Sequence, residues 1–311
     1  MMHRIFLAAL LCSFMAVRAQ TAHDYFKQGK ELFLAEKYDE ALKKFDKAVK
    51  MSPDSSSYLV ERGRTHMKLK QFQKAHDDYS SAIYLKSTNL WAYYYRANLY
   101  YWAKKFEEAI KDNNMVVMLA HHDSLKINAY VNSSSCAMNY RDFAAARDFL
   151  LKARKIDSLE SDIYVNLAIV ESESGNGQLA VDYSIKAYKL DTSSTPALMN
   201  IGYFMTKIED YKGALPYFDK AIQREPDNGY AYNNRGFAKL KLGDLEGALE
   251  DVNKSIKLDA YNSYAYKNRA LVYIEMKKDK KACADLEKAK ELGFTARYGD
   301  EVIILMNKHC K

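Results

Sequence analysis

Proline and glycine are scarce in this sequence, at 4 and 12 of 311 residues. Disordered chains and all-β sandwiches carry more of both, so their scarcity disfavours these two classes and favours helix. Blocks of positive charge are also missing, because Lys, Arg, Asp and Glu are interleaved and the net charge is only +7. The sequence therefore lacks the basic patch of a nucleic-acid-binding protein, and we expect no nucleic-acid partner.

Long apolar runs are absent after the N-terminus. Residues 1–19 begin Met-Met-His-Arg, continue with an apolar run from Ile5 to Met15, and end with small residues around Arg18. This pattern predicts a secretory signal peptide cleaved after Ala19, and hence a secreted or periplasmic protein. A buried amphipathic helix is the alternative for this segment. No later stretch is long enough to cross a bilayer, so we expect no integral membrane segment.

Cysteine is rare as well. Apart from Cys12 in the signal segment, only Cys136, Cys283 and Cys310 remain. An odd number leaves one thiol free or joined to a second chain. Because Cys283 and Cys310 lie close together near the C-terminus, we expect a disulfide between them. Metal binding is the less favoured alternative, since no CxxC motif or nearby His completes a ligand set.

An internal repeat of 34 residues runs through the rest of the chain. One alanine marks the same place in each of eight repeats: Ala41, Ala75, Ala109, Ala146, Ala180, Ala214, Ala248 and Ala282. Twelve residues before each alanine stands a small residue, such as Gly29 or Gly202, and four residues before that stands a large apolar or aromatic one. Small residues at these spacings let two antiparallel helices cross closely, so each repeat is predicted to be a helical hairpin.

The repeats resemble those of the tetratricopeptide repeat (TPR) family, with Tyr-x-x-x-Gly openings, Ala in the second helix, and Pro53 and Pro226 at repeat ends. The resemblance implies an all-α fold, a right-handed α-solenoid of about eight TPR hairpins followed by a C-terminal capping helix. We expect a short loop at 124–126 and the capping helix within 297–311, starting at Asp300. The eight repeats are expected at 22–55, 56–89, 90–123, 127–160, 161–194, 195–228, 229–262 and 263–296.

Four arginines recur three residues beyond the aromatic slot: Arg62, Arg96, Arg235 and Arg269. We interpret them as structural, because an arginine stem covers apolar surface while its head bonds to acids or carbonyls of an adjoining repeat. Contact with phosphate or nucleic acid is the alternative, and the weak net charge disfavours it.

In the TPR family the first helix of each repeat lines a concave surface, and the same register here implies a groove that binds a partner. Large rings suit an extended peptide or an amphipathic helix, although single rings could instead pack against a neighbouring repeat. Phe26, Phe33, Val60 and Arg64 belong to this register in the first two repeats. The predicted groove residues further along are Trp91, Tyr94, Asn98, Tyr101, Trp102, Val131, Met138, Val165, Ile169, Met199, Tyr203, Asn233, Phe237 and Leu240.

The sequence thus predicts an exported, non-catalytic scaffold that binds a peptide or helix of an envelope or extracellular protein, as a monomer or weak dimer. Catalytic motifs such as G-x-S-x-G, a P-loop or H-E-x-x-H are missing, so we expect no enzyme activity, no cofactor and no metal. The first alternative is a carbohydrate- or small-ligand-binding protein using the same rings, and an enzyme built on the repeats is the second. The signal peptide, repeats and cysteine-bearing cap together resemble TPR proteins exported by Bacteroides-type bacteria.

Overall fold

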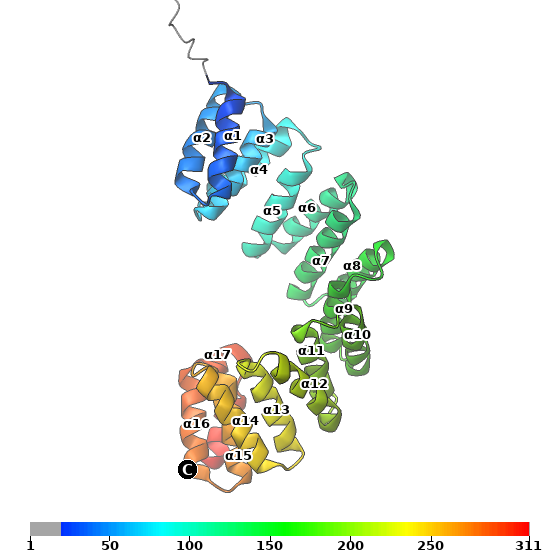
Figure 1. The fold of residues 1–311 in the computed structure, drawn as a ribbon, viewed down its shortest axis with the longest axis vertical. Coiled ribbons are helices and arrows are strands. Elements are labelled where there is room, and N and C mark those ends of the chain that lie inside the picture. Colours follow the sequence, from blue (N-terminus) through cyan, green and yellow to red (C-terminus); the bar gives the residue numbers. More distant parts are fainter. Residues whose placement is uncertain (1–19, 311) are drawn as a thin grey trace, which may run out of the picture. The chain divides into compact units, whose positions relative to one another are not determined.

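The computed structural model describes residues 20–310, so the predicted signal peptide and its cleavage site lie outside the described residues. Within 20–310 all regular structure is helical, in 18 helices (Figure 1). By its internal contacts the chain divides into two compact units, the first ending at Cys136 and the second beginning at Ala137. The expected all-α fold is confirmed.

The first unit consists of three complete hairpins and most of a further helix. The pairs are α1 (Ala22–Leu34) with α2 (Tyr38–Met51), α3 (Ser56–Lys68) with α4 (Phe72–Leu85), and α5 (Leu90–Trp102) with α6 (Phe106–Leu119). Helix α7 (Asp123–Asn139) begins in this unit and ends in the second. Each hairpin also packs on the next through its second helix, as α2 does on α3.

The second unit starts with α8 (Phe143–Ile156) and continues as four complete hairpins and a C-terminal cap. The cap consists of α17 (Phe294–Tyr298) and α18 (Glu301–His309). Within each unit, consecutive hairpins pack on one another as in a TPR-like solenoid. The four pairs are α9 (Ser161–Glu173) with α10 (Gly177–Leu190), α11 (Thr195–Lys207) with α12 (Tyr211–Arg224), α13 (Gly229–Lys241) with α14 (Leu245–Leu258), and α15 (Ser263–Glu275) with α16 (Asp279–Glu291).

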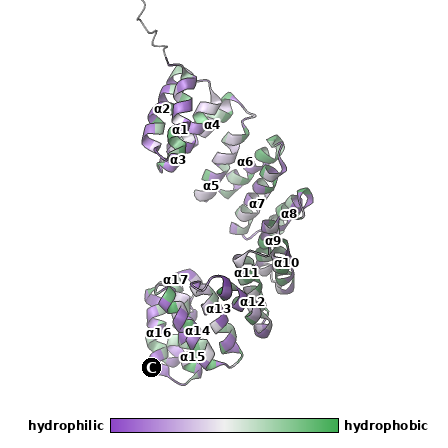
Figure 2. Cartoon of the chain, in the orientation of Figure 1, coloured by the Kyte–Doolittle hydropathy of each residue, from purple (hydrophilic) through white to green (hydrophobic). Residues whose placement is uncertain are grey.

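Small residues permit the close helix crossing inside the hairpins, as the repeat pattern predicts. A Cβ atom placed on Gly29 would lie 2.7 Å from the ring of Phe45, and one on Gly202 would lie 2.5 Å from the ring of Phe218. All eight marker alanines are completely buried. Hydrophobic and hydrophilic residues alternate along the helices (Figure 2), so each hairpin has an apolar side that a neighbour can cover.

Each hairpin turn contains one residue with positive φ. Glycine occupies this place at Gly175 (84°) and Gly243 (83°), whereas the other hairpins use residues with side chains, such as Glu36 (59°) and Lys104 (58°). The left-handed conformation ends the first helix and redirects the chain into the second. The turn geometry is therefore shared even where the sequence lacks its usual glycine.

The loop expected at 124–126 is wrong, because these residues belong to the first turns of α7. Asp123 stands in the first turn, where a negative charge favours the helix, and Lys126 Nζ lies 3.3 Å from its carboxylate. The helix continues into the buried Ile127. Extending an existing helix adds one hydrogen bond for each residue ordered, and α7 begins four residues before the expected repeat start at 127, which gives it 17 residues.

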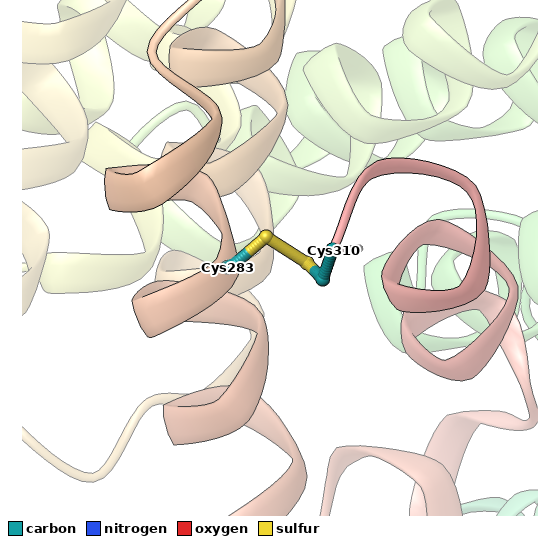
Figure 3. The surroundings of a disulfide bond; sticks show 2 residues. All are labelled: Cys283 and Cys310. Carbon is teal, nitrogen blue, oxygen red and sulfur yellow. A yellow bond between two sulfur atoms is a disulfide. The ribbon is translucent and has the colours of Figure 1, made fainter.

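The C-terminal cap is pinned to the last hairpin by a disulfide. Cys283 on α16 is bonded to Cys310, which directly follows α18 (Figure 3), so the structure contains the predicted pair. Phe294 and Val302 of the cap are completely buried in one cluster with α16. The cap has two helices instead of the single expected one, because Gly299, with a φ of 91°, separates α17 from α18.

The remaining thiol, Cys136, is completely buried and free. Burial raises its pKa to about 11, so the thiol stays protonated at neutral pH. None of the helices in residues 20–310 is long and apolar enough to cross a membrane.

The four recurring arginines are structural, as interpreted from the sequence. Each binds both oxygens of an aspartate 16 residues later on the second helix of its own hairpin: Asp78, Asp112, Asp251 and Asp285. The same guanidinium also donates to a polar residue 16 residues earlier, on the preceding hairpin: Asp46, Ser80, Asp219 and Asn253. Each arginine therefore ties its hairpin to the one before.

Candidate functional site

The first helices of the three N-terminal hairpins bring aromatic rings together. Phe26 on α1 stacks on Tyr58 of α3, with ring centroids 4.5 Å apart. On α5, Trp91 stacks on Tyr95 at 5.9 Å, one helical turn away. These two stacks belong to three consecutive first helices, which are the helices that the repeat register assigns to the groove.

Arg64 on α3 connects the rings of the neighbouring hairpins. Its guanidinium carbon lies 4.8 Å from the ring centroid of Phe33 and 5.0 Å from that of Tyr95. Such cation–π contacts are attractive because the ring face is electron-rich. The same guanidinium donates to Glu61 Oε2 at 2.6 Å, which orients it and compensates its charge.

Phe26, Glu61, Arg64, Trp91 and Tyr95 line a cavity of about 270 Å³ on the first unit, which we call the aromatic cavity. Trp91 on its rim is 47% exposed, so a ligand can reach the indole face. Burial raises the pKa of Tyr95, and its hydroxyl therefore remains a hydrogen-bond donor at neutral pH. The lining residues are Phe26, Ser57, Val60, Glu61, Arg64, Asn89, Trp91 and Tyr95.

Four of the lining residues, Phe26, Val60, Arg64 and Trp91, were expected in the groove, whereas Glu61 and Tyr95 were not. Their sequence signal was the helical spacing: Glu61 stands three residues before Arg64, and Tyr95 four residues after Trp91. Residues at these spacings share one face of a helix. The register implied by the family resemblance specifies fixed positions in a repeat. It therefore misses lining residues at other positions of the same helix face.

Other predicted groove residues of the first unit fall into two groups. Tyr94 contacts Trp91, a lining residue of the aromatic cavity, edge to face at 5.7 Å. Tyr101 and Trp102 pair with each other at 6.0 Å, near the opposite end of α5, and Trp102 is 77% exposed. Asn98 lies between the two groups on α5, and Val131 lies half-buried on α7.

The predicted groove residues of the second unit include two aromatic pairs. Tyr203 is 44% exposed on α11 and contacts the ring of Phe204. Phe237 on α13 contacts Tyr211. The others are half-buried on the first helices of this unit: Met138, Val165, Ile169 and Met199.

Two predicted groove residues, Asn233 and Leu240, are buried and cannot contact a partner. Asn233 is 2% exposed and accepts a hydrogen bond from Asn268 Nδ2 at 2.9 Å, which joins α13 to α15. Leu240 packs in a core cluster with Ala248 and Val272. Both lie where α13 meets neighbouring helices, so their side chains are used for packing.

The cap closes the end of the second unit over Lys267 on α15. Its Nζ lies 3.1 Å from Glu301 Oε1 of α18 and 4.7 Å from the ring centroid of Tyr264. Burial lowers the pKa of Lys267, and the pairing with Glu301 opposes that effect. The buried Lys267 therefore holds α18 against α15 through Glu301 and is not available to a ligand.

The TPR family matches three stretches of the chain, at residues 26–89, 195–228 and 217–250. The chain is similar to human sperm-associated antigen 1, with 27% identity over 93 residues, which is 30% of this chain and 10% of that protein. It is also similar to human serine/threonine-protein phosphatase 5, with 29% identity over 102 residues, or 33% of this chain and 19% of that protein. The chain thus matches only a small part of the length of these relatives.

Two solved structures show the fold over most of the chain. A tetratricopeptide repeat protein from Parabacteroides merdae aligns with 92% of this chain and 98% of its own, with a TM-score of 0.52 and 15% identity. The APC/C hetero-tetramer Cut9–Hcn1 contains a chain that aligns with 92% of this chain and 55% of its own, with a TM-score of 0.61 and 16% identity. At such identities the likeness is one of fold.

Proposed function

We propose that this chain, whose repeats match the tetratricopeptide repeat family over part of its length, is a scaffold for protein–protein interaction, and that its aromatic cavity binds a peptide or helix of a partner protein. We further propose that the protein is non-catalytic and exported, and that the partner belongs to the cell envelope or the extracellular space. The observation that carries the proposal is the exposed Trp91 on the rim of a cavity lined by three consecutive hairpins, with rings from the first and third and Val60 and Arg64 from the second.

The chemistry of the cavity suits a peptide. Trp91, Tyr95 and Phe26 offer apolar contact area that loses little side-chain entropy on binding. Asn89 and Ser57 add polar groups beside the rings, and Arg64 with Glu61 adds one charge of each sign. A peptide presents apolar side chains, amides and charges together, and this combination matches the lining.

Two observations support export. The first 19 residues have the charge and apolar pattern of a signal peptide. The Cys283–Cys310 disulfide suits an oxidising compartment, because disulfides are rare in the reducing cytosol. Edman sequencing of protein from the native host tests this point, and mature protein that starts at Gln20 is the expected result.

Carbohydrate binding is the second candidate function, and it is favoured by one observation. Trp102 is 77% exposed beside Tyr101, away from the aromatic cavity, and an open indole face can stack on a sugar ring. Binding of purified glycans that is lost in Trp102→Ala but kept in Trp91→Ala would support this function.

The peptide proposal is tested by crosslinking followed by binding with purified components. A photo-crosslinking amino acid replaces Tyr94 beside the cavity, and in a control it replaces Tyr84, which is exposed on the second helix α4. A synthetic peptide of the segment captured only from position 94 is then titrated against purified protein. We expect Trp91→Ala to abolish its binding and Tyr84→Ala to leave it unchanged. Equal capture from both positions, or binding that survives Trp91→Ala, would refute the proposal.

A further inference from the structure

A different cavity lies in the second unit, where the turn between α12 and α13 meets the turn between α14 and α15. Its volume is about 580 Å³. It is separate from the aromatic cavity, which belongs to the first unit. The lining residues that matter for its chemistry are Glu225, Asp227, Gly229, Tyr230, Asp259 and Asn262. We call it the acidic cavity.

Three carboxylates line this cavity, and its lining includes no Lys, Arg or His. Glu225 accepts a hydrogen bond from Asn228 Nδ2 at 2.9 Å, which lowers the pKa of Glu225 and keeps it charged. Asp259 accepts from the backbone N–H of Tyr261 at 2.9 Å. Within residues 20–310 no three acidic, His or Cys side chains are grouped closely enough to hold a metal ion. The negative charge is thus spread along the lining, which suits an organic cation better than a metal.

A buried amide on the cavity wall is left without its hydrogen bond. Asn262 is only 7% exposed, and its Oδ1 accepts from the backbone N–H groups of Tyr264 and Ala265, which determines how the amide is turned. Its Nδ2 has no hydrogen-bond partner among the described residues, and neither has Ser255 Oγ, which lies 3.8 Å from a Cβ placed on Gly229. A buried polar group without a hydrogen-bond partner is unfavourable, so an incoming acceptor would be stabilised here.

A cavity at the corresponding position of another repeat lies in the first unit. It differs from the acidic cavity in the partner of its asparagine and in the charge of its lining. Asn89 corresponds to Asn262, and its Nδ2 donates to Ser56 Oγ at 2.8 Å. Gly229 stands at the place of Ser56, so the hydroxyl that would satisfy Asn262 is missing. Lys86 lines the corresponding cavity of about 570 Å³, whereas Asp259 occupies its place in the acidic cavity. Relative to its counterpart, the acidic cavity therefore lacks one cation and one acceptor.

We propose that the acidic cavity binds a basic segment of a protein partner, with an arginine or lysine side chain facing the carboxylates. The cation lies against Glu225, Asp227 and Asp259, where it supplies the charge that Lys86 supplies in the first unit. An acceptor of the same segment takes the hydrogen bond of Asn262 in the space left by Gly229. Tyr230, which is largely exposed on the rim, offers a ring face to the cation.

The test is a titration of the full-length mature protein, labelled with ¹⁵N, with the peptide acetyl-Gly-Arg-Gly-amide. Its control is the same peptide with citrulline, which has the shape of arginine but no charge. We expect saturable shifts at the Gly229 amide and the Asn262 side-chain amide, and at least about tenfold weaker binding of the citrulline peptide, a difference of about 1.4 kcal/mol. Equal binding of both peptides, or no saturable shift, overturns the proposal.

Two variants separate binding from folding. Gly229→Ser fits, because the nearest atom to its Cβ lies 3.4 Å away, and its hydroxyl can satisfy Asn262 as Ser56 satisfies Asn89. We expect it to keep or raise the denaturation midpoint and to lose peptide binding. Glu225→Gln/Asp259→Asn keeps both acceptors but removes two charges, and we expect the two peptides to bind it equally weakly. Unchanged arginine binding in either variant, or equal shifts at Ser57 in the first unit, contradicts the assigned site.

Discussion

The guanidinium of Arg235 on α13 donates two parallel hydrogen bonds to the carboxylate of Asp251 on α14, from Nε to Oδ2 at 2.8 Å and from Nη2 to Oδ1 at 2.6 Å. Its third nitrogen donates to Asp219 of the preceding hairpin at 2.8 Å. The side chain of Asp251 is 4% exposed and that of Asp219 is 58% exposed. One arginine therefore has a buried partner and an exposed partner.

The two partners of Arg235 are expected to contribute very differently to stability. Asp251 also pairs with Lys239 Nζ at 2.8 Å, so Asp251→Ala removes this partner of Lys239 and leaves Arg235 with only the exposed Asp219. It should lower the free energy of unfolding by about 3–5 kcal/mol. Asp219→Ala removes a solvent-screened pair and should lower it by less than about 1 kcal/mol. Urea denaturation of both variants measures the difference, and losses of equal size would contradict this account of the arginines.

Gly202 is expected to tolerate no larger side chain. In Gly202→Ala the new Cβ would meet the ring of Phe218, and such overpacking lowers the free energy of unfolding by about 1–3 kcal/mol. Gly229→Ala is the matched control, because its Cβ meets only ordinary contacts and alanine favours helix. Thermal denaturation should show a loss only for Gly202→Ala. Similar melting temperatures for both variants would contradict the close crossing of α11 and α12.

Stability should fall in acid through Glu171. This glutamate is 1% exposed, and hydrogen bonds from Arg147, with a further one from Asn176, lower its pKa below the ordinary 4.5. A lowered pKa in the folded state means that its contribution is complete above about pH 4.5 and declines as the pH falls through the folded pKa. Glu171→Gln should therefore differ more from the wild type at pH 7 than at pH 3.

The free energies of unfolding of Glu171→Gln and the wild type are measured by urea denaturation at pH 7 and at pH 3. The matched control is Asp148→Asn, whose carboxylate pairs with Lys152 while 61% exposed. We expect this variant to differ little from the wild type at either pH, because exposed pairs are screened by solvent. A Glu171→Gln difference that is the same at pH 7 and pH 3 would show that the charge of Glu171 does not stabilise the fold.

The disulfide should stabilise the cap more than the rest of the second unit. Cys283 and Cys310 are 27 residues apart, and a cross-link that closes such a loop stabilises by about 3.5 kcal/mol in the chain-entropy treatment. In Cys283→Ser/Cys310→Ser, hydrogen exchange should accelerate first in α18, while α13 and α14 keep their protection. Reduction of the wild type serves as the chemical control. Uniform protection across the unit in the double variant would refute this prediction.

The repeats and the hairpins were readable from the sequence because close helix packing requires small residues at regular spacings, and that requirement is local. The four structural arginines were also readable from the sequence, because they recur at the same place in their repeats. An aspartate 16 residues later accompanies each of the four, so the signal was present in the sequence. The Cys283–Cys310 pair was predicted on proximity in sequence and follows from the packing of α18 on α16.

Which residues form the candidate sites depends more on tertiary packing than the hairpins do. Asn233 and Phe237 both lie in the predicted register, yet Asn233 is buried against α15 while Phe237 stays half-buried. A register indicates the face of a helix but not whether a neighbouring helix covers that face.

The amino-acid sequence by itself determined the helical hairpins, because helix periodicity and small-residue spacing act within one repeat. Only the tertiary structure decided which rings stay accessible, where Arg64 meets Tyr95, and that Asn262 lacks the partner that Asn89 has. These features arise between repeats. They depend on how side chains from different hairpins meet, and no single repeat contains that information.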